Sequence, residues 1–98
     1  MTLNASDRTH LHRAASLLAG VGWADPVDVD PGVALLCLAA AEQLRPLVAP
    51  VVPASGSTPP QAVDDALASL VALSQEAFAG EAVLDAADYA RHARALLT

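Results

Sequence analysis

The longest run of apolar positions in the chain predicts a helix that is hydrophobic on nearly every side. This run extends from Val33 to Ala41 and meets its first charge at Glu42. Asp30 and Pro31 precede it, a side-chain cap followed by the residue whose missing N–H costs nothing at the first helical position. A surface helix is apolar along one stripe only, so we expect other helices or a second chain to cover this one all round.

Four helices in total follow from the 3.6-residue spacing of apolar positions and from residues that start or stop helices. They span about residues 6–19, 31–45, 59–79 and 85–97. Asn4 or Ser6 caps the first helix and Gly20 stops it, and Pro46 either ends or kinks the second. No alternating segment is long enough to count as a strand. The sequence therefore predicts an all-α fold, a small antiparallel four-helix bundle of one domain over residues 1–98, with the second helix at its centre.

The later helices carry their own local signals. Thr58 and Gln61 match a capping box at the start of the third helix. Ser74 lies within the apolar stripe of that helix, and we expect its hydroxyl to bond back to the carbonyl of Leu70. The fourth helix is predicted to begin near Asp85.

Charge and composition exclude several classes of function. The net charge is −6 and every positive charge is an arginine, so the chain has no basic face for nucleic acid or for an anionic membrane surface. The apolar run from Val33 is about half of the roughly 20 residues that a membrane span requires. The N-terminal residues lack a signal-peptide pattern, and Cys37 is the single cysteine, which suits a reducing compartment. We therefore expect a cytoplasmic protein, and the absence of Ile and Lys is typical of a GC-rich bacterial genome.

One cluster of residue types is compatible with a metal ion. Asp85, Asp88 and His92 share a face of the last helix, and Asp7 and His10 could converge with them if the first and last helices were neighbours. The alternative is a solvated helix flank in which Asp88 and His92 form a weak pair. No cofactor is expected from the sequence.

A second set of residues could address a small molecule between helices. Glu42, Arg45 and Tyr89 are polar groups beside leucine- and alanine-rich faces, and a pocket lined by such faces could bind an apolar ligand. The alternative is that Glu42 and Arg45 mark the point where the second helix leaves the core. Cys37 is expected to be a buried structural thiol. No convergent set of catalytic groups is present, so no catalytic residue is assigned and an enzyme is the less favoured class.

The segment 38–45 resembles the second helix of acyl and peptidyl carrier proteins, which are small, acidic and four-helical. Carriers attach their prosthetic group to the serine of an Asp-Ser-Leu triplet. The nearest triplet here is Leu36-Cys37-Leu38, so the attachment serine is missing. We assign no carrier function.

The apolar second helix instead favours an interaction module. If Val33 and Cys37 face the bundle, Leu35 and Leu38 point the opposite way. Trp23 in the acidic connector is a further candidate anchor, and the alternative is that it plugs the open end of the bundle. The sequence therefore predicts a small acidic protein–protein interaction or accessory module that self-associates as a homodimer or binds another protein. The alternative is a small-molecule-binding bundle or an accessory subunit of an enzyme.

Overall fold

The computed structural model describes residues 4–25, 27–48 and 50–97, and within them every regular element is a helix. The elements are α1 (Ala5–Gly22), α2 (Pro31–Leu44), the 3-10 helix η1 (Arg45–Leu47), α3 (Pro59–Val71), α4 (Gln75–Phe78) and α5 (Glu81–Leu96). The predicted all-α fold is therefore confirmed over the described residues. None of these helices has the length and hydrophobicity needed to cross a membrane.

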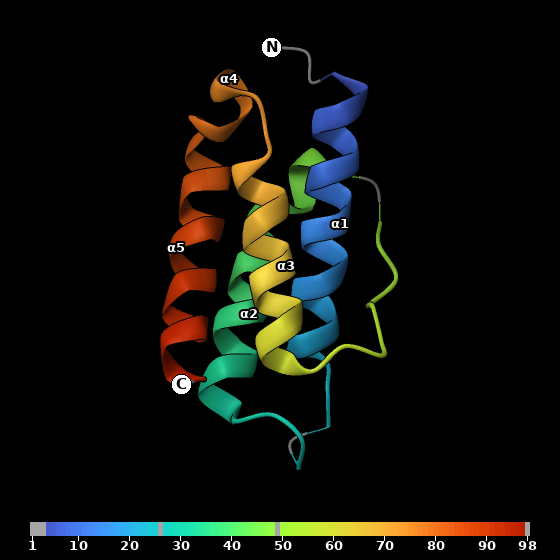
Figure 1. Ribbon diagram of the computed structural model, residues 1–98, viewed down its shortest axis with the longest axis vertical. Coiled ribbons are helices and arrows are strands. Elements are labelled where there is room, and N and C mark those ends of the chain that lie inside the picture. Colours follow the sequence, from blue (N-terminus) through green and yellow to red (C-terminus); the bar gives the residue numbers. More distant parts are fainter. Residues whose placement is uncertain (1–3, 26, 49, 98) are drawn as a thin grey trace.

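The four long helices lie lengthwise beside one another, and α4 is a single turn at the end of the molecule where α1 begins (Figure 1). α2 packs against α1 and α5, and α3 packs against the same two helices. Residues 50–58 run along the outside of α1 to reach the start of α3 (Figure 1). The result is an elongated body of 40 × 23 × 19 Å.

The core consists of aliphatic side chains from all four long helices. Its largest fully buried members are Leu11, Leu18, Leu44, Leu70, Val33, Val63, Val83 and Cys37. Alanines occupy many of the other contact positions, and the completely buried ones are Ala14, Ala40, Ala66, Ala86, Ala90 and Ala93. Because the distance between packed helices depends on the side chains at the contact, these alanines allow the helices to pack closely.

The starts of the first three helices are set by the residues that the sequence indicated. The side chains of Asn4, Asp30 and Thr58 each accept a hydrogen bond from a backbone N–H in the first turn that follows, at 2.7, 2.8 and 3.4 Å. α2 ends at Leu44, and Pro46 lies within the short 3-10 helix that follows. Pro46 thus ends the α-helix and does not merely kink it.

The expectation that Gly20 stops the first helix is wrong. α1 continues to Gly22, and its last turn is closed by a hydrogen bond from the Trp23 N–H to the Ala19 carbonyl at 2.9 Å. Gly20 lies inside the helix, and this position needs a glycine because the connector between η1 and α3 passes directly over it. A Cβ atom at this position would collide with the backbone carbonyl of Ala54.

The predicted helix over residues 59–79 is interrupted. α3 ends at Val71, and Ser74 does not bond back to Leu70; its hydroxyl caps α4 by accepting from the Ala77 N–H at 3.3 Å. α5 begins at Glu81, with Gly80 at its N-cap, and so starts earlier than predicted.

The interruption is fixed by a contact with the start of α1. Asp7 is buried there, and its carboxylate accepts from the backbone N–H of Ser74 at 2.9 Å and from the Ser74 hydroxyl at 2.7 Å. These two donors favour the charged form of Asp7 and therefore lower its pKa below the ordinary value of 3.8. The backbone N–H has the larger effect. Residues 67 positions apart are thereby joined at one end of the molecule.

This contact predicts a specific loss of stability in acid. Because the pKa of Asp7 is lower in the folded than in the unfolded chain, its contribution is fully present above pH 3.8 and is lost as the pH falls through the folded pKa. Asp7→Asn should lower the free energy of unfolding at neutral pH and make it less dependent on pH below 3.8. Urea unfolding at a series of pH values measures both effects.

Ser74→Ala serves as the matched variant, because it removes the hydroxyl donor, together with the cap of α4, and leaves the carboxylate in place. It should show part of the loss in free energy of unfolding that Asp7→Asn shows at neutral pH. If the free energy of unfolding fell by the same amount in the wild type and in Asp7→Asn over the acid range, this role of Asp7 would be contradicted.

Candidate functional site

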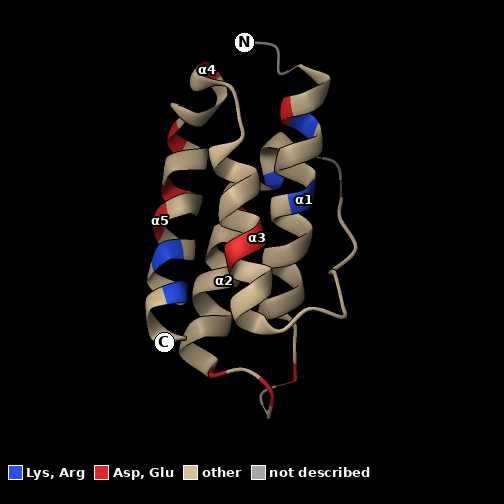
Figure 2. Ribbon diagram, viewed as in Figure 1, with Lys and Arg blue, Asp and Glu red and all other residues tan. Residues whose placement is uncertain are grey.

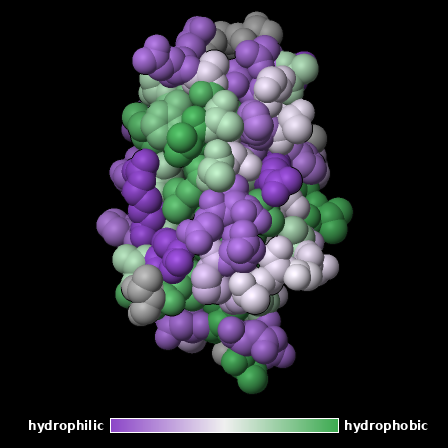
Figure 3. Space-filling view, viewed as in Figure 1, coloured by the Kyte–Doolittle hydropathy of each residue, from purple (hydrophilic) through white to green (hydrophobic). Residues whose placement is uncertain are grey.

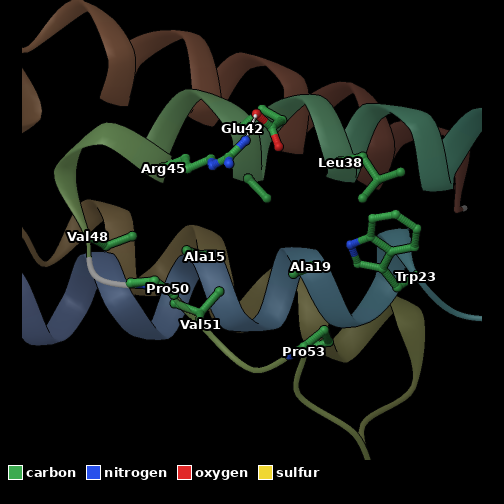
Figure 4. Close-up of a pocket in the computed structure, with 11 residues that line it drawn as sticks. Ala15, Ala19, Trp23, Leu38, Glu42, Arg45, Val48, Pro50, Val51 and Pro53 are labelled. Carbon is green, nitrogen blue, oxygen red and sulfur yellow. Dashed lines mark hydrogen bonds and ion pairs between the residues drawn. The ribbon is translucent and has the colours of Figure 1, made fainter.

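A groove with a volume of about 390 Å³ lies between α1, α2 and the connector that joins α2 to α3 (Figure 4). α1 contributes Ala15 and Ala19, which are one turn apart on the same face. α2 contributes Leu38 and Ala41. The side chains on the α1 side are too small to fill the space between the two helices, so an apolar hollow remains.

The connector forms the outer wall of the groove and is held to α1 by hydrogen bonds. The Ser16 hydroxyl donates to the carbonyl of Val52 at 2.7 Å, and the Ala54 N–H donates to the carbonyl of Ser16 at 3.0 Å. Val51 and Pro53 of this segment face the hollow (Figure 4). The wall therefore depends on Ser16 and on the bare backbone at Gly20.

One end of the groove is closed by Leu38 and Trp23. The Leu38 side chain lies directly over Gly22, where a Cβ atom would be 2.5 Å from its Cγ. The Trp23 ring lies across from Leu38 (Figure 4) and is 73% exposed. An indole exposed to this degree beside an apolar hollow is an available contact surface.

The other end of the groove carries an ion pair. The Arg45 guanidinium lies 3.4 Å from the Glu42 carboxylate, and both side chains are mostly exposed (Figure 4). Within the described part of the chain, these two are the charged residues that line the groove. An exposed pair of this spacing contributes only about 0.3–0.5 kcal/mol, so both groups can change partners at little cost.

The groove brings together residues that the sequence assigned to two different sites. Trp23 and Leu38 were predicted as interface residues, and Glu42 and Arg45 as ligand-binding residues. Leu35, the third predicted interface residue, is 67% exposed on α2 and does not line the groove. Its i,i+3 spacing from Leu38 makes the two neighbours on the helix surface.

Tyr89 does not join this site. It lies on α5, half-buried, and packs against the hydrophobic core. Sequence reasoning also missed the wall of the groove. The Ser16 contact that holds the wall spans 36 positions, and no local pattern indicates it.

The residues suggested for a metal ion are not gathered into a site. Asp85, Asp88 and His92 are exposed on α5, and Asp88 accepts a hydrogen bond from Arg91 at 3.0 Å. Asp7 is turned toward Ser74. Among residues 4–25, 27–48 and 50–97, no group of three or more His, Cys, Asp or Glu side chains is placed to hold a metal ion.

Cys37 is completely buried on the inner face of α2 and is not part of the groove. Burial raises the pKa of its thiol to about 11, so the thiol stays protonated at neutral pH. Since the thiolate is the nucleophile, this cysteine is a packing residue, as expected from the sequence.

A second hollow of about 630 Å³ lies beyond Trp23 and Pro53, which border both spaces. Its inner surface includes the buried Val21 and Val29, and its rim carries Asp25. Acidic residues mark this end of the molecule and much of α5 (Figure 2). Charge therefore distinguishes this end from the groove, where one residue of each sign is present.

No protein-family model, curated protein sequence or solved structure matches this chain.

The packing of the connector on α1 predicts whether one substitution raises or lowers the free energy of unfolding. Gly→Ala inside a helix normally stabilises by about 1 kcal/mol. Gly20→Ala should instead reduce the free energy of unfolding by about 1–3 kcal/mol, because the new methyl group meets the Ala54 carbonyl and overpacks the site. Chemical denaturation measures the difference.

Ala68→Gly on the exposed side of α3 is the matched control, because it reports the helix-propensity effect alone. A Gly20→Ala variant more stable than the wild type would show that the connector is not packed on α1.

Proposed function

We propose that this chain is a non-enzymatic helical interaction module that acts as a homodimer through the outer face of α2. The observation that carries the proposal is the exposure of two large apolar side chains near Leu38: Trp23, which lies across from it (Figure 4), is 73% exposed, and Leu35, one helical turn away on α2, is 67% exposed. Full burial of one leucine is worth roughly 1.5–3 kcal/mol, so covering this surface provides a substantial incentive to associate. Aromatic residues are also enriched in the buried centres of interfaces.

The proposal extends to the architecture. In this view the four long helices form an antiparallel four-helix bundle, and α2 becomes its central element once a second chain covers its outer face. The inner face of α2 is already buried through Val33, Cys37, Ala40 and Leu44. A twofold axis is the default symmetry for two identical chains. We place the module in the cytoplasm, where a free Cys37 stays reduced.

The direct test is Leu35→Glu. The substitution places a charge within the proposed interface without disturbing the core, because Leu35 is mostly exposed within the single chain. The variant should be a folded monomer, with the helical circular dichroism of the wild type, at concentrations where the wild type is a dimer. Sedimentation equilibrium measures the masses.

Val71→Glu is the matched control, because Val71 is 69% exposed on α3 and undergoes the same change of charge. This variant should remain dimeric. Dimerisation of Leu35→Glu with wild-type affinity would contradict the proposed interface.

The groove itself supports a second candidate function, the binding of a small apolar molecule by the single chain. Its volume of about 390 Å³ falls within the range of roughly 300–1,000 Å³ that is usual for ligand sites. On this alternative, the fluorescent probe 8-anilinonaphthalene-1-sulfonate should bind the Leu35→Glu monomer, and Ala41→Leu should weaken that binding by filling the groove. Fluorescence titration of the two proteins tests it, and equal binding would exclude the groove as the site.

A further inference from the structure

The two charged residues of the groove are arranged so that their charges complement those of a second copy of the same surface. Glu42 is the one charged residue of α2, and Arg45 follows directly after the helix ends. They carry opposite signs and lie one helical turn apart, 3.4 Å from each other and mostly exposed. An interface with twofold symmetry places residue i against residue j and j against i. One acid and one base at this spacing satisfy that condition when the two helices run antiparallel.

The rest of the molecule disfavours contact between identical chains. The net charge is −6, so two copies repel each other unless the touching surfaces are locally neutral. Figure 3 shows another apolar patch, over the upper ends of α3 and α5, where Val71 and Leu84 are exposed. Glu81 and Asp85 lie on the same part of α5, so two identical chains meeting there would bring these like charges together (Figure 2).

We propose that a second copy docks across the groove with its α2 antiparallel to the first, so that Glu42 of each chain pairs with Arg45 of the other. This inference rests on the proposed homodimer and adds the relative orientation of the two chains and the charged pairs between them. Like charges placed opposite each other across an interface are strongly unfavourable, whereas complementary charges select the correct partner.

Charge reversal provides the test. Glu42→Arg alone places two arginines opposite each other at both symmetry-related contacts, and Arg45→Glu alone places two glutamates there. Each variant should dimerise about tenfold more weakly than the wild type, or worse. An equimolar mixture of the two variants should form a heterodimer with near wild-type affinity, because both contacts then join opposite charges. Native mass spectrometry at low salt resolves the species, since the two variants differ in mass.

The design separates the cross-chain pairing from other effects of charge. Each single variant also loses the pair within its own chain, and mixing does not restore that pair, so recovery on mixing reports the contact between chains. Glu42→Arg makes the net charge less negative, so the general repulsion between two copies decreases. If net charge alone mattered, this variant would therefore associate more strongly than the wild type. The double variant Glu42→Arg/Arg45→Glu restores opposite charges at both contacts and should dimerise like the wild type.

The outcomes distinguish this inference from the proposal on which it rests. A wild-type monomer would overturn the homodimer and the pairing together. A wild-type dimer whose single variants dimerise normally, or whose mixed variants form no preferred heterodimer, would overturn the pairing alone. Far-ultraviolet circular dichroism confirms in each case that the variants are folded.

Discussion

The close approach of α2 and the connector to α1 is the constraint on which the rest of the structure depends. At Gly20 the connector backbone occupies the space of a side chain, and at Gly22 the Leu38 side chain does the same. Between these contacts and the start of η1, Ala15 and Ala19 are too small to fill the gap. The same choice of small residues therefore brings three segments together and leaves a groove between them.

The groove in turn explains why α2 is apolar on nearly every side. Its inner face packs into the core through Val33 and Cys37, as an ordinary bundle helix does. On its outer side, Leu38 covers Gly22 and borders the groove, while Leu35 remains exposed to solvent. In our account a second chain covers this outer side, and the helix then has apolar neighbours all round. Because Glu42 and Arg45 balance each other, the face can meet its own copy in a molecule that is otherwise strongly acidic.

Local sequence signals predicted the helices and most of their starts, because a cap such as Asp30 or Thr58 acts within its own first turn. They failed where a distant segment intervenes. Gly20 looks like a helix stop but serves a long-range contact, and Ser74 interrupts a predicted helix because Asp7 binds it from the far end of the chain. Four of the candidate site residues, which were chosen from their chemistry alone, line the groove. The alanine surface and the connector wall were not predicted, since both depend on which helix lies beside which.

The central claim is that two copies of this chain associate through the face formed by α2, Trp23 and the groove. Native mass spectrometry of the purified wild-type protein over a tenfold range of concentration tests it most directly. The account predicts a dimer of bare chains whose fraction rises with concentration and whose mass includes no bound small molecule. A monomer at every concentration, particularly one that carries a small-molecule adduct, would contradict the claim and favour the groove as a ligand site.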